Sequence, residues 1–349
     1  MTALFEAALI NDAFEDPGVF VALRFAKRGL LVDLGDLGRL APRQLLRVSH
    51  VFVSHTHMDH FIGFDRLLLI CLGRERRLDF FGPPGFIDRV EHKLAAYTWN
   101  LIAGNETDFV IGAAEVLGDS LATAAEFHTR DAFRRRALPP PALAKGIIVN
   151  DRDFRVRAVT LDHRTPCLAF ALEERLRINV WKDRLQQLGL PVGPWLNDLK
   201  AAVRRGEPDQ TSLMVSWVEA GQHHERPASL GELKSEVLRI APGQKLAYVT
   251  DAVHSSANAS RIIELAQDAD QLFIETPFLD QDADIAARKC HLTAAQAGSL
   301  ARSAHVKRVV PFHFSPRYIG REHEIREEVQ RAFRGFAADR SATAYDDAG

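Results

Sequence analysis

Short apolar runs alternate with polar segments along the whole chain, and their lengths predict a protein with both strands and helices. In the first half the runs are brief and end at turn residues, which is typical of strands buried on both faces. The strands expected in this half cover residues 18–25, 30–33, 51–54, 78–82, 147–149, 154–161 and 167–172. The expected helices cover residues 42–46, 65–72 and 87–101. Residues 134–141, with three arginines and three prolines, mark an exposed connection.

Strands and helices alternate regularly in the last third of the chain. The strands expected there cover residues 213–218, 245–250, 271–275 and 309–314, and the helices cover 257–267, 294–304 and 322–333. Strands in both halves, mostly followed by helices, predict an α/β sandwich that forms one domain over residues 1–349. Residues 173–210 are expected to form an excursion from this domain, and the polar tail after Gly335 is expected to fray.

Composition supports a globular protein, because 46% of the 349 residues are apolar and 26% are charged. The formal net charge of -2 argues against a broad electrostatic grip on a polyanion, although bound cations would add local positive charge. The three scattered cysteines, Cys71, Cys167 and Cys290, suit reduced, buried positions. The first residues lack the features of a signal peptide, and no apolar run approaches the roughly 20 residues that span a bilayer. We therefore expect a cytoplasmic protein without membrane contact.

One segment carries four candidate metal ligands within six positions, directly after the expected strand 51–54. It reads His55-Thr56-His57-Met58-Asp59-His60, and alternate side chains at a strand end can converge on one point. His55 and His57 are spaced to share one ion, while Asp59 and His60 can reach a second. Imidazole and carboxylate ligands together suit zinc and similar first-row ions.

Further candidate ligands follow other strands in the same way. His163 follows the expected strand 154–161, Asp251 follows 245–250, and His313 lies just past the apolar run 309–311. Three such positions at strand ends are what a two-metal site needs to complete its ligand set, so we expect them to meet the first four.

This pattern resembles the metallo-β-lactamase superfamily, whose members form a four-layer αββα sandwich that binds one or two metal ions. Three segments resemble its ribonuclease Z branch, the tRNA 3′ endonucleases, more narrowly. They are Phe312-His313-Phe314-Ser315-Pro316-Arg317-Tyr318, His291-Leu292-Thr293-Ala294-Ala295-Gln296-Ala297 and the glycine- and proline-rich stretch 188–194 with Leu199-Lys200. The resemblance runs from about residue 31 to residue 318. By this resemblance, the excursion 173–210 is similar to the arm with which ribonuclease Z enzymes bind tRNA, in a reduced form.

The resemblance implies a ligand set for each ion. One ion would be held by His55, His57 and His163, and the other by Asp59, His60 and His313, with Asp251 bridging the two ions. The ions would be zinc, although iron and manganese also accept such ligands.

The resemblance also implies roles outside the ligand set. Asp33 would support the ligand loop, because ligating histidines usually donate their other N–H to a carboxylate or carbonyl. His291 would act as the general acid that protonates the leaving oxygen, and Glu275 would keep that imidazole protonated. Arg317 has two interpretations, a contact with the substrate phosphate or a structural pair with an acid.

The function implied is that of a metal-dependent phosphodiesterase or endoribonuclease, in which a hydroxide bridging two ions attacks the phosphodiester and Asp59 belongs to the catalytic centre. Its partners would be a tRNA precursor or another RNA and, by family resemblance, a second copy of the chain. Residues 8–12 and 33–37 differ from the glycine-rich family pattern, which bears on tRNA specificity. Two alternatives stay open, the first because a metal-bound hydroxide serves carbonyl chemistry as well. One is hydrolysis of a small carbonyl compound such as a lactone, thioester or lactam. The other is an RNA- or nucleotide-binding protein without catalysis.

Overall fold

The computed structural model describes residues 3–24, 26–102, 106–219 and 221–335, and it divides into two compact units. The larger unit contains Glu6–Val149, Val156–Leu172 and the chain from Lys245 onwards. The smaller unit contains the N-terminal residues to Phe5, together with Asn150–Arg155 and Glu173–Gln244. The end of the expected strand at residue 25 and the tail after Gly335 lie outside the described residues.

An eight-stranded sheet carries the first half of the larger unit, with its strands in sequence order from β1 to β8. Their bounds are β1 Phe5–Leu9, β2 Val19–Leu23, β3 Arg28–Val32, β4 Val48–Phe52, β5 Arg76–Gly82, β6 Phe109–Leu117, β7 Ser120–His128 and β8 Arg135–Leu138. Strands β2 and β3 form an antiparallel pair, whereas β3, β4, β5 and β6 run parallel. The buried residues of the parallel strands β3 and β4 are mostly apolar, and β3 ends in the apolar run Leu30–Val32 while β4 ends in Val51-Phe52.

A six-stranded sheet lies against the first, in the order β18-β17-β16-β11-β10-β9. Its strands are β9 Ile147–Asn150, β10 Phe154–Asp162, β11 Pro166–Glu174, β16 Lys245–Val249, β17 Gln271–Glu275 and β18 Val309–Phe312. The strands β16, β17 and β18 are parallel, so their carboxyl ends meet at one edge of the sheet. Between the two sheets, the ring of Phe52 packs 5.6 Å from that of Phe170, measured between centroids.

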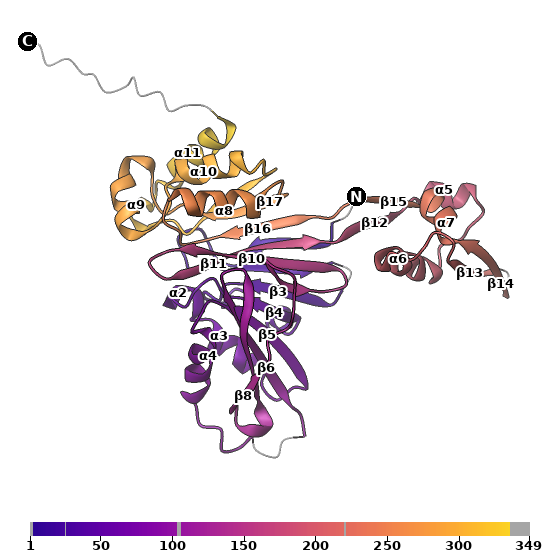
Figure 1. The fold of residues 1–349 in the computed structure, drawn as a ribbon, viewed down its shortest axis with the longest axis horizontal. Helices are drawn as coiled ribbons and strands as arrows, with labels where there is room; N and C mark the ends of the chain where they lie inside the picture. Colours follow the sequence, from indigo (N-terminus) through magenta and orange to yellow (C-terminus); the bar gives the residue numbers. More distant parts are fainter. Residues whose placement is uncertain (1–2, 25, 103–105, 220, 336–349) are drawn as a thin grey trace, which may run out of the picture. The chain divides into compact units, whose positions relative to one another are not determined.

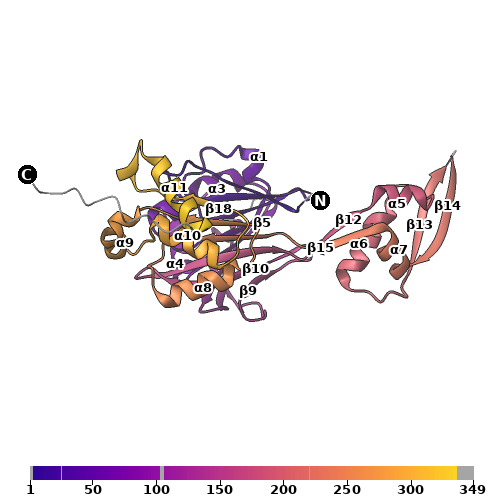
Figure 2. The ribbon, with the colours of Figure 1, turned by 90° about the horizontal axis from the view of Figure 1, so that it is seen from above.

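Helices cover the outer faces of both sheets (Figure 1). Those on the first sheet are α1 Pro42–Leu45, α2 Met58–Phe61, α3 Phe64–Cys71 and α4 Phe86–Ala95, and their apolar faces join one buried cluster with β3 to β7. Those on the second sheet are α8 Ser256–Ala266, α9 Ala283–Lys289, α10 Ala294–Ser303 and α11 Glu322–Arg334, which share a second cluster with β16 to β18. Figure 2 shows α8 and α10 over this sheet from above. The result is the four-layer αββα sandwich that the sequence predicted.

The smaller unit has an apolar core of its own, formed around Trp195, Leu199 and Leu233. Its elements are β12 Leu176–Val180, α5 Lys182–Gln187, α6 Trp195–Arg205, β13 Ser212–Glu219, β14 Gln222–Ser229, α7 Leu230–Val237 and β15 Leu238–Pro242. Strands β12 and β15 pair, and β13 and β14 form a hairpin. The unit includes the expected excursion 173–210 but continues to Gln244. The description as one domain with an excursion stays a prediction.

One expectation about an element was wrong. Residues 134–141 were expected to be an exposed connection, but they contain the strand β8, whose four residues are all exposed and therefore lack an apolar pattern. Residues 213–218 form a strand as expected, within β13, but this strand belongs to the smaller unit, where Val215 is buried in the core and Leu213 and Trp217 pack against it. No helix in the described part of the chain is long and apolar enough to cross a bilayer.

Candidate metal centre

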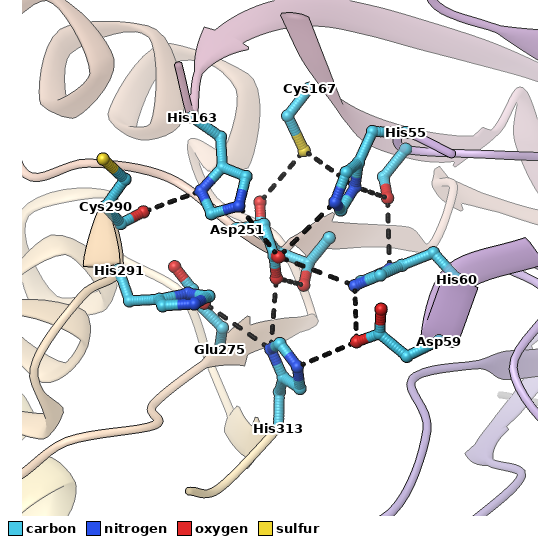
Figure 3. A network of polar contacts seen from close by, with 12 residues as sticks. His55, Asp59, His60, His163, Cys167, Asp251, Glu275, Cys290, His291 and His313 are labelled. Carbon is cyan, nitrogen blue, oxygen red and sulfur yellow. Dashed lines mark hydrogen bonds and ion pairs between the residues drawn. The ribbon is translucent and has the colours of Figure 1, made fainter. Parts of the chain in front are cut away.

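A cluster of histidine and carboxylate side chains lies just beyond the ends of four strands of the larger unit (Figure 3). The loop after β4 supplies four of them, and the segments after β10, β16 and β18 supply one each. The seven residues are His55, His57, Asp59, His60, His163, Asp251 and His313. The ligand atoms of His55, His57, His163 and Asp251 lie within 4.8 Å of one another, and so do those of Asp59, His60 and His313. These two groups coincide with the two ligand sets that the resemblance implies.

Asp251 lies between the two groups and contacts both. Its Oδ2 atom is 3.5 Å from Nε2 of His55 and 3.3 Å from Nε2 of His163. The same oxygen is 3.6 Å from Nε2 of His60, and Oδ1 is 3.1 Å from Nδ1 of His313. Asp251 is 2% exposed, so the charge of its carboxylate is balanced by the surrounding imidazoles and not by water.

The free nitrogen atoms of the cluster show that its residues fit a metal ion. Among the described residues, Nε2 of His55, Nε2 of His60 and Nδ1 of His313 are buried and make no hydrogen bond. A buried polar atom without a partner costs free energy, and all three atoms face the carboxylate of Asp251 (Figure 3). Divalent ions at the centre of the cluster would satisfy them, and nitrogen and carboxylate oxygen are suitable donors.

Hydrogen bonds outside the cluster fix the orientation of these rings. Nδ1 of His60 donates to Oδ2 of Asp33 at 2.8 Å, and Nδ1 of His163 donates to the backbone carbonyl of Cys290 at 2.8 Å. Nδ1 of His55 lies 3.1 Å from Oγ of Ser54. Because the hydroxyl of Ser54 donates its hydrogen to Asp33, its oxygen accepts from Nδ1 of His55. In each ring Nδ1 therefore carries a proton for this bond, and Nε2 faces the cluster.

Asp33 is fully buried behind the ligand loop and accepts four hydrogen bonds. Its Oδ1 atom accepts the backbone N–H of Ser54 at 2.7 Å. Its Oδ2 atom accepts from the hydroxyl of Ser54 at 2.8 Å, from Nδ1 of His60 at 2.8 Å and from the phenol of Tyr248 at 2.7 Å. This carboxylate thus connects β3, the loop after β4 and β16 at one point.

Three residues of the site have a left-handed backbone conformation. The φ angles are 58° at Asp33, 44° at Asp251 and 60° at His313, and each residue lies one or two positions after the end of a strand. Residues other than glycine rarely adopt this region, although aspartate and histidine tolerate it better than most. The turn ends each strand abruptly. It directs the side chains of Asp251 and His313 into the cluster and that of Asp33 behind the ligand loop, and the surrounding hydrogen bonds stabilise the strained backbone.

Burial and mutual charge divide the histidines of the cluster into two kinds. Burial, helped by the neighbouring His60, lowers the pKa of His55 to about 3, and burial also lowers the pKa of His57. Burial opposes a charge on His60 and His313 as well, but Asp251 outweighs it and raises the pKa of both. His55 and His57 are therefore neutral at physiological pH, which is the form that binds a metal ion.

Comparison with known proteins places this cluster in a family. No family model matches the chain. The ribonuclease Z of Deinococcus radiodurans is 31% identical over 347 residues, which cover 98% of this chain and 99% of that protein. The chain belongs to the ribonuclease Z family. A ribonuclease Z from a Cyanothece species is 30% identical over 93% of this chain and 87% of its own length.

The fold agrees with this membership. The metallo-β-lactamase fold protein YhfI from Bacillus subtilis superimposes with a TM-score of 0.53, at 15% identity, over 95% of this chain and 94% of that chain. The chain is therefore a metallohydrolase of the ribonuclease Z family, with a cluster that binds divalent metal ions.

This member of the ribonuclease Z family has a His–Glu pair beside the metal ligands, in which Glu275 is buried and His291 is partly exposed. Nδ1 of His291 donates to Oε2 of Glu275 at 2.7 Å, and Oε1 of Glu275 accepts the backbone N–H groups of Ala252 and Leu292. Burial opposes charge on both side chains. Their attraction outweighs it, so that the pKa of Glu275 falls to about 2 and that of His291 rises. The ring centroid of His291 lies 5.6 Å from that of His313, so the imidazolium borders the cluster.

The cluster opens into a cavity of about 510 Å³. Its lining combines metal-ligand candidates with three basic residues, Arg164, Arg288 and Lys289. Arg317 does not line this cavity: its guanidinium lies 3.1 Å from the carboxylate of Asp282. The acid pair expected as one interpretation of Arg317 is thus present, and its contact with a phosphate stays a prediction.

Sequence reasoning missed several residues that hold the site. Tyr248 reaches Asp33 from β16, and Ser54 bonds both Asp33 and His55. The buried thiol of Cys167 lies 3.4 Å from the carbonyl of Thr250 and 3.7 Å from Nδ1 of His55, and all three cysteines are free and buried, as expected. Ser54 could have been found from its place between the strand and the first ligand. Tyr248 gave no such signal, because it sits within an apolar strand.

Proposed function

We propose that the chain is an endoribonuclease that removes 3′ extensions from tRNA precursors, with two zinc ions bound in the cluster. The observation that carries the proposal is the pair of His291 with the buried Glu275, next to a complete set of His and Asp ligands. Membership of the ribonuclease Z family supports the choice of substrate. When bound, the two ions would activate water and neutralise charge that develops on the phosphoryl group.

The ligand sets proposed for the ions follow the two groups of the cluster. His55, His57 and His163 hold one ion, and Asp59, His60 and His313 hold the other, with Asp251 shared between them. Asp33 positions His60 through its hydrogen bond and does not itself contact substrate. The ligands would accept iron or manganese as well, so we base the choice of zinc on the mixture of imidazole and carboxylate donors.

His291 supplies the proton that the leaving 3′-oxygen needs. The carboxylate of Glu275 accepts the hydrogen bond from Nδ1, which leaves Nε2 free to donate its proton toward the cavity. The raised pKa of His291, caused mainly by Glu275 against the effect of burial, keeps the ring protonated before the reaction. The basic residues that line the cavity favour a polyanionic substrate although the formal net charge is -2.

The same proposal includes a homodimer, a cytoplasmic location and a single hydrolase domain whose smaller unit corresponds to the excursion. Free, buried cysteines are compatible with a reducing compartment. Sedimentation of the purified chain tests the dimer, which should have twice the mass of the monomer.

A comparison of substrates tests the class of reaction. We expect the zinc-loaded enzyme to hydrolyse bis(p-nitrophenyl) phosphate faster than a thioester or a lactone, because the basic residues that line the cavity and the bound ions favour an anionic phosphodiester over an uncharged carbonyl compound. A preference for the thioester or the lactone would instead identify a hydrolase of small carbonyl compounds. The expected order of rates should disappear on treatment with a chelator.

A further inference from the structure

A second cavity, of about 260 Å³, lies beside the metal cluster and shares part of its wall with the first. Asp59, His291, His313 and Lys289 line both cavities. The rest of the second cavity is largely aromatic and proline-rich, in contrast to the basic lining of the first. These apolar residues are Phe14, Pro17, Pro277, Phe278, Phe314 and Pro316. The site thus has a basic side and an aromatic side.

The aromatic side is held in place by backbone hydrogen bonds. The N–H of Phe314 donates to the carbonyl of Ala13 at 2.7 Å, which ties the loop between β1 and β2 to the residue that follows His313. The ring of Phe14 packs edge-to-face on that of Phe314, with centroids 5.4 Å apart. The carbonyl of Pro17 accepts the N–H of Gly35 at 3.0 Å. The wall is therefore formed before any substrate arrives.

Phe14 is the ring of this wall that is open to a ligand. Phe278 and Phe314 are 3% and 2% exposed, whereas Phe14 is only partly buried. The acidic residues on the same rim are already engaged: Glu15 pairs with Arg39 at 2.8 Å, and Asp16 accepts the backbone N–H of residue 36. The rim is therefore less repulsive to an anion than its acidic residues suggest.

Lys289 stands at the border between the two cavities. It is exposed at the end of α9, and its Nζ atom lies 5.9 Å from the ring centroid of Phe278. Within the described residues it has no carboxylate partner, so its charge is free for a ligand. An ammonium group in this place can contact a phosphate held at the metal cluster.

We infer that the aromatic cavity is a subsite for the base of a nucleotide next to the scissile phosphate. Lys289 binds the phosphate of that nucleotide, and Phe14 stacks on its base. The inference rests on the proposed function, since it assigns a place to part of the same RNA substrate. Aromatic side chains recognise unpaired bases by stacking, a preformed wall avoids the entropy cost of ordering, and a flexible cation beside the ring suits a phosphate.

Two phosphodiesters that differ in one group test the subsite. The p-nitrophenyl ester of thymidine 5′-phosphate carries a base, and methyl p-nitrophenyl phosphate does not. We expect the wild-type enzyme to prefer the thymidine ester in kcat/KM, and we expect F14L to reduce this preference by about tenfold, mainly through KM, because stacking on one ring has about that value. F14A should reduce it at least as much.

The lysine is tested by salt dependence on a 3′-extended RNA. K289Q should raise KM and make the slope of log KM against log salt shallower by about 1, the change expected for one lost phosphate contact. K289R should restore most of the slope. K145Q is the matched control, because Lys145 is an exposed lysine of the same unit that pairs with Asp119 and lines neither cavity.

The outcomes separate the two proposals. If the wild-type enzyme hydrolyses both esters without a preference, or if F14L and K289Q behave as the wild type does, the subsite is wrong while the endonuclease proposal stands. If the wild-type enzyme hydrolyses no phosphodiester, both proposals fail. A thermal unfolding midpoint of F14L within a few degrees of the wild type excludes unfolding as the cause of any loss.

Discussion

The imidazole rings around the cluster share one arrangement, in which one nitrogen binds a fixed acceptor and the other faces the site. His60 uses Asp33, His163 uses the carbonyl of Cys290, and His291 uses Glu275. The acceptor fixes the orientation of each ring. Asp33 and the carbonyl of Cys290 turn Nε2 of His60 and of His163 toward the cluster, whereas Glu275 holds His291 at its border and favours the charged form of that ring.

Replacing the proposed proton donor separates metal binding from catalysis. H291A should bind two ions per chain as the wild type does, because His291 is not in either proposed ligand set. Its kcat on an RNA substrate should fall by about 10²- to 10⁴-fold, the usual contribution of a general acid. Metal content by mass spectrometry and kcat are the two measurements. Wild-type kcat on a substrate with a poor leaving group would remove His291 from the mechanism.

Replacing Asp33 should weaken the metal site without removing a ligand. In D33N, the amide nitrogen can no longer accept the hydrogen bonds that Oδ2 receives, so the ring of His60 loses its fixed orientation. We expect metal affinity to fall by about 10- to 100-fold, as for other partners of ligating histidines. Competition with a chelator of known affinity measures this. Y248F, which removes one of the four bonds, should have a smaller effect, and equal effects of the two variants would contradict the account.

At the scale of elements, the site depends on strands that end together and on the helices that fix the following segments. Helix α10 begins just after His291 with a capping box, in which Oγ1 of Thr293 accepts the N–H of Gln296 and Oε1 of Gln296 accepts the N–H of Thr293. Helix α10 packs closely on α11 at Gly298. A Cβ atom at that position would lie 2.4 Å from the carbonyl oxygen of Val329.

The contact between α10 and α11 predicts that G298A is destabilising. Alanine favours a helix over glycine by roughly 0.5–1 kcal/mol, but the clash with a backbone carbonyl should dominate. We expect the free energy of unfolding to fall by about 1–3 kcal/mol, the range for overpacking in a core. Urea denaturation measures it, with S299A on the same helix as the control that should change little. Stabilisation by G298A would show that the helices are not in close contact.

The end of β7 predicts a dependence of stability on pH. Nδ1 of His128 lies 2.6 Å from Asp108 and Nε2 lies 2.9 Å from Glu126. Burial opposes the charge of His128, but the two carboxylates outweigh it and raise its pKa. The pKa of His128 in the folded protein is thus above the unfolded value of about 6.5. The stability that the charged ring contributes is therefore complete below pH 6.5, and it is lost as the pH rises through the folded pKa. The difference in unfolding free energy between wild type and H128Q should shrink from pH 6 to pH 9; a constant difference would exclude the charge effect.

The sequence predicts those parts of the fold and site that depend on local patterns. Strands such as β3, β4 and β16 end in short apolar runs, and the ligands that come two or three residues after β16 and β4 could be located because each follows such a run. Strand β8 could not be found, since an exposed edge strand has no apolar pattern. The bond from Tyr248 to Asp33 joins residues 215 positions apart, and such a contact follows from the pairing of two sheets and not from any local signal.

At the scale of the whole molecule, a formal net charge close to zero coexists with basic residues at the proposed reaction site. The formal net charge is only -2, yet the cavity at the cluster is lined by Arg164, Arg288 and Lys289, and bound divalent ions would add positive charge. RNA binding should therefore depend on a few contacts near the cluster and on the ions, and less on a broad basic surface.

This dependence on the ions can be measured directly. For a protein that makes one or two phosphate contacts, raising salt from 50 to 200 mM weakens the affinity for nucleic acid by about tenfold or less. Removing the metal should weaken the affinity of this enzyme for a 3′-extended tRNA precursor by more than that. Filter binding of metal-free and metal-loaded H291A, which binds without rapid cleavage, provides the comparison. Equal affinities with and without metal would show that the ions do not contact the substrate.

Cleavage of a 3′-extended tRNA precursor beside an unstructured RNA of the same length tests the central claim most directly. We predict that the zinc-loaded enzyme cuts the precursor once, next to the discriminator base, and releases a tRNA with a 3′-hydroxyl and a trailer with a 5′-phosphate. Chelation should abolish the cut and added zinc should restore it. Failure to cut the precursor, with intact metal content, would contradict the account.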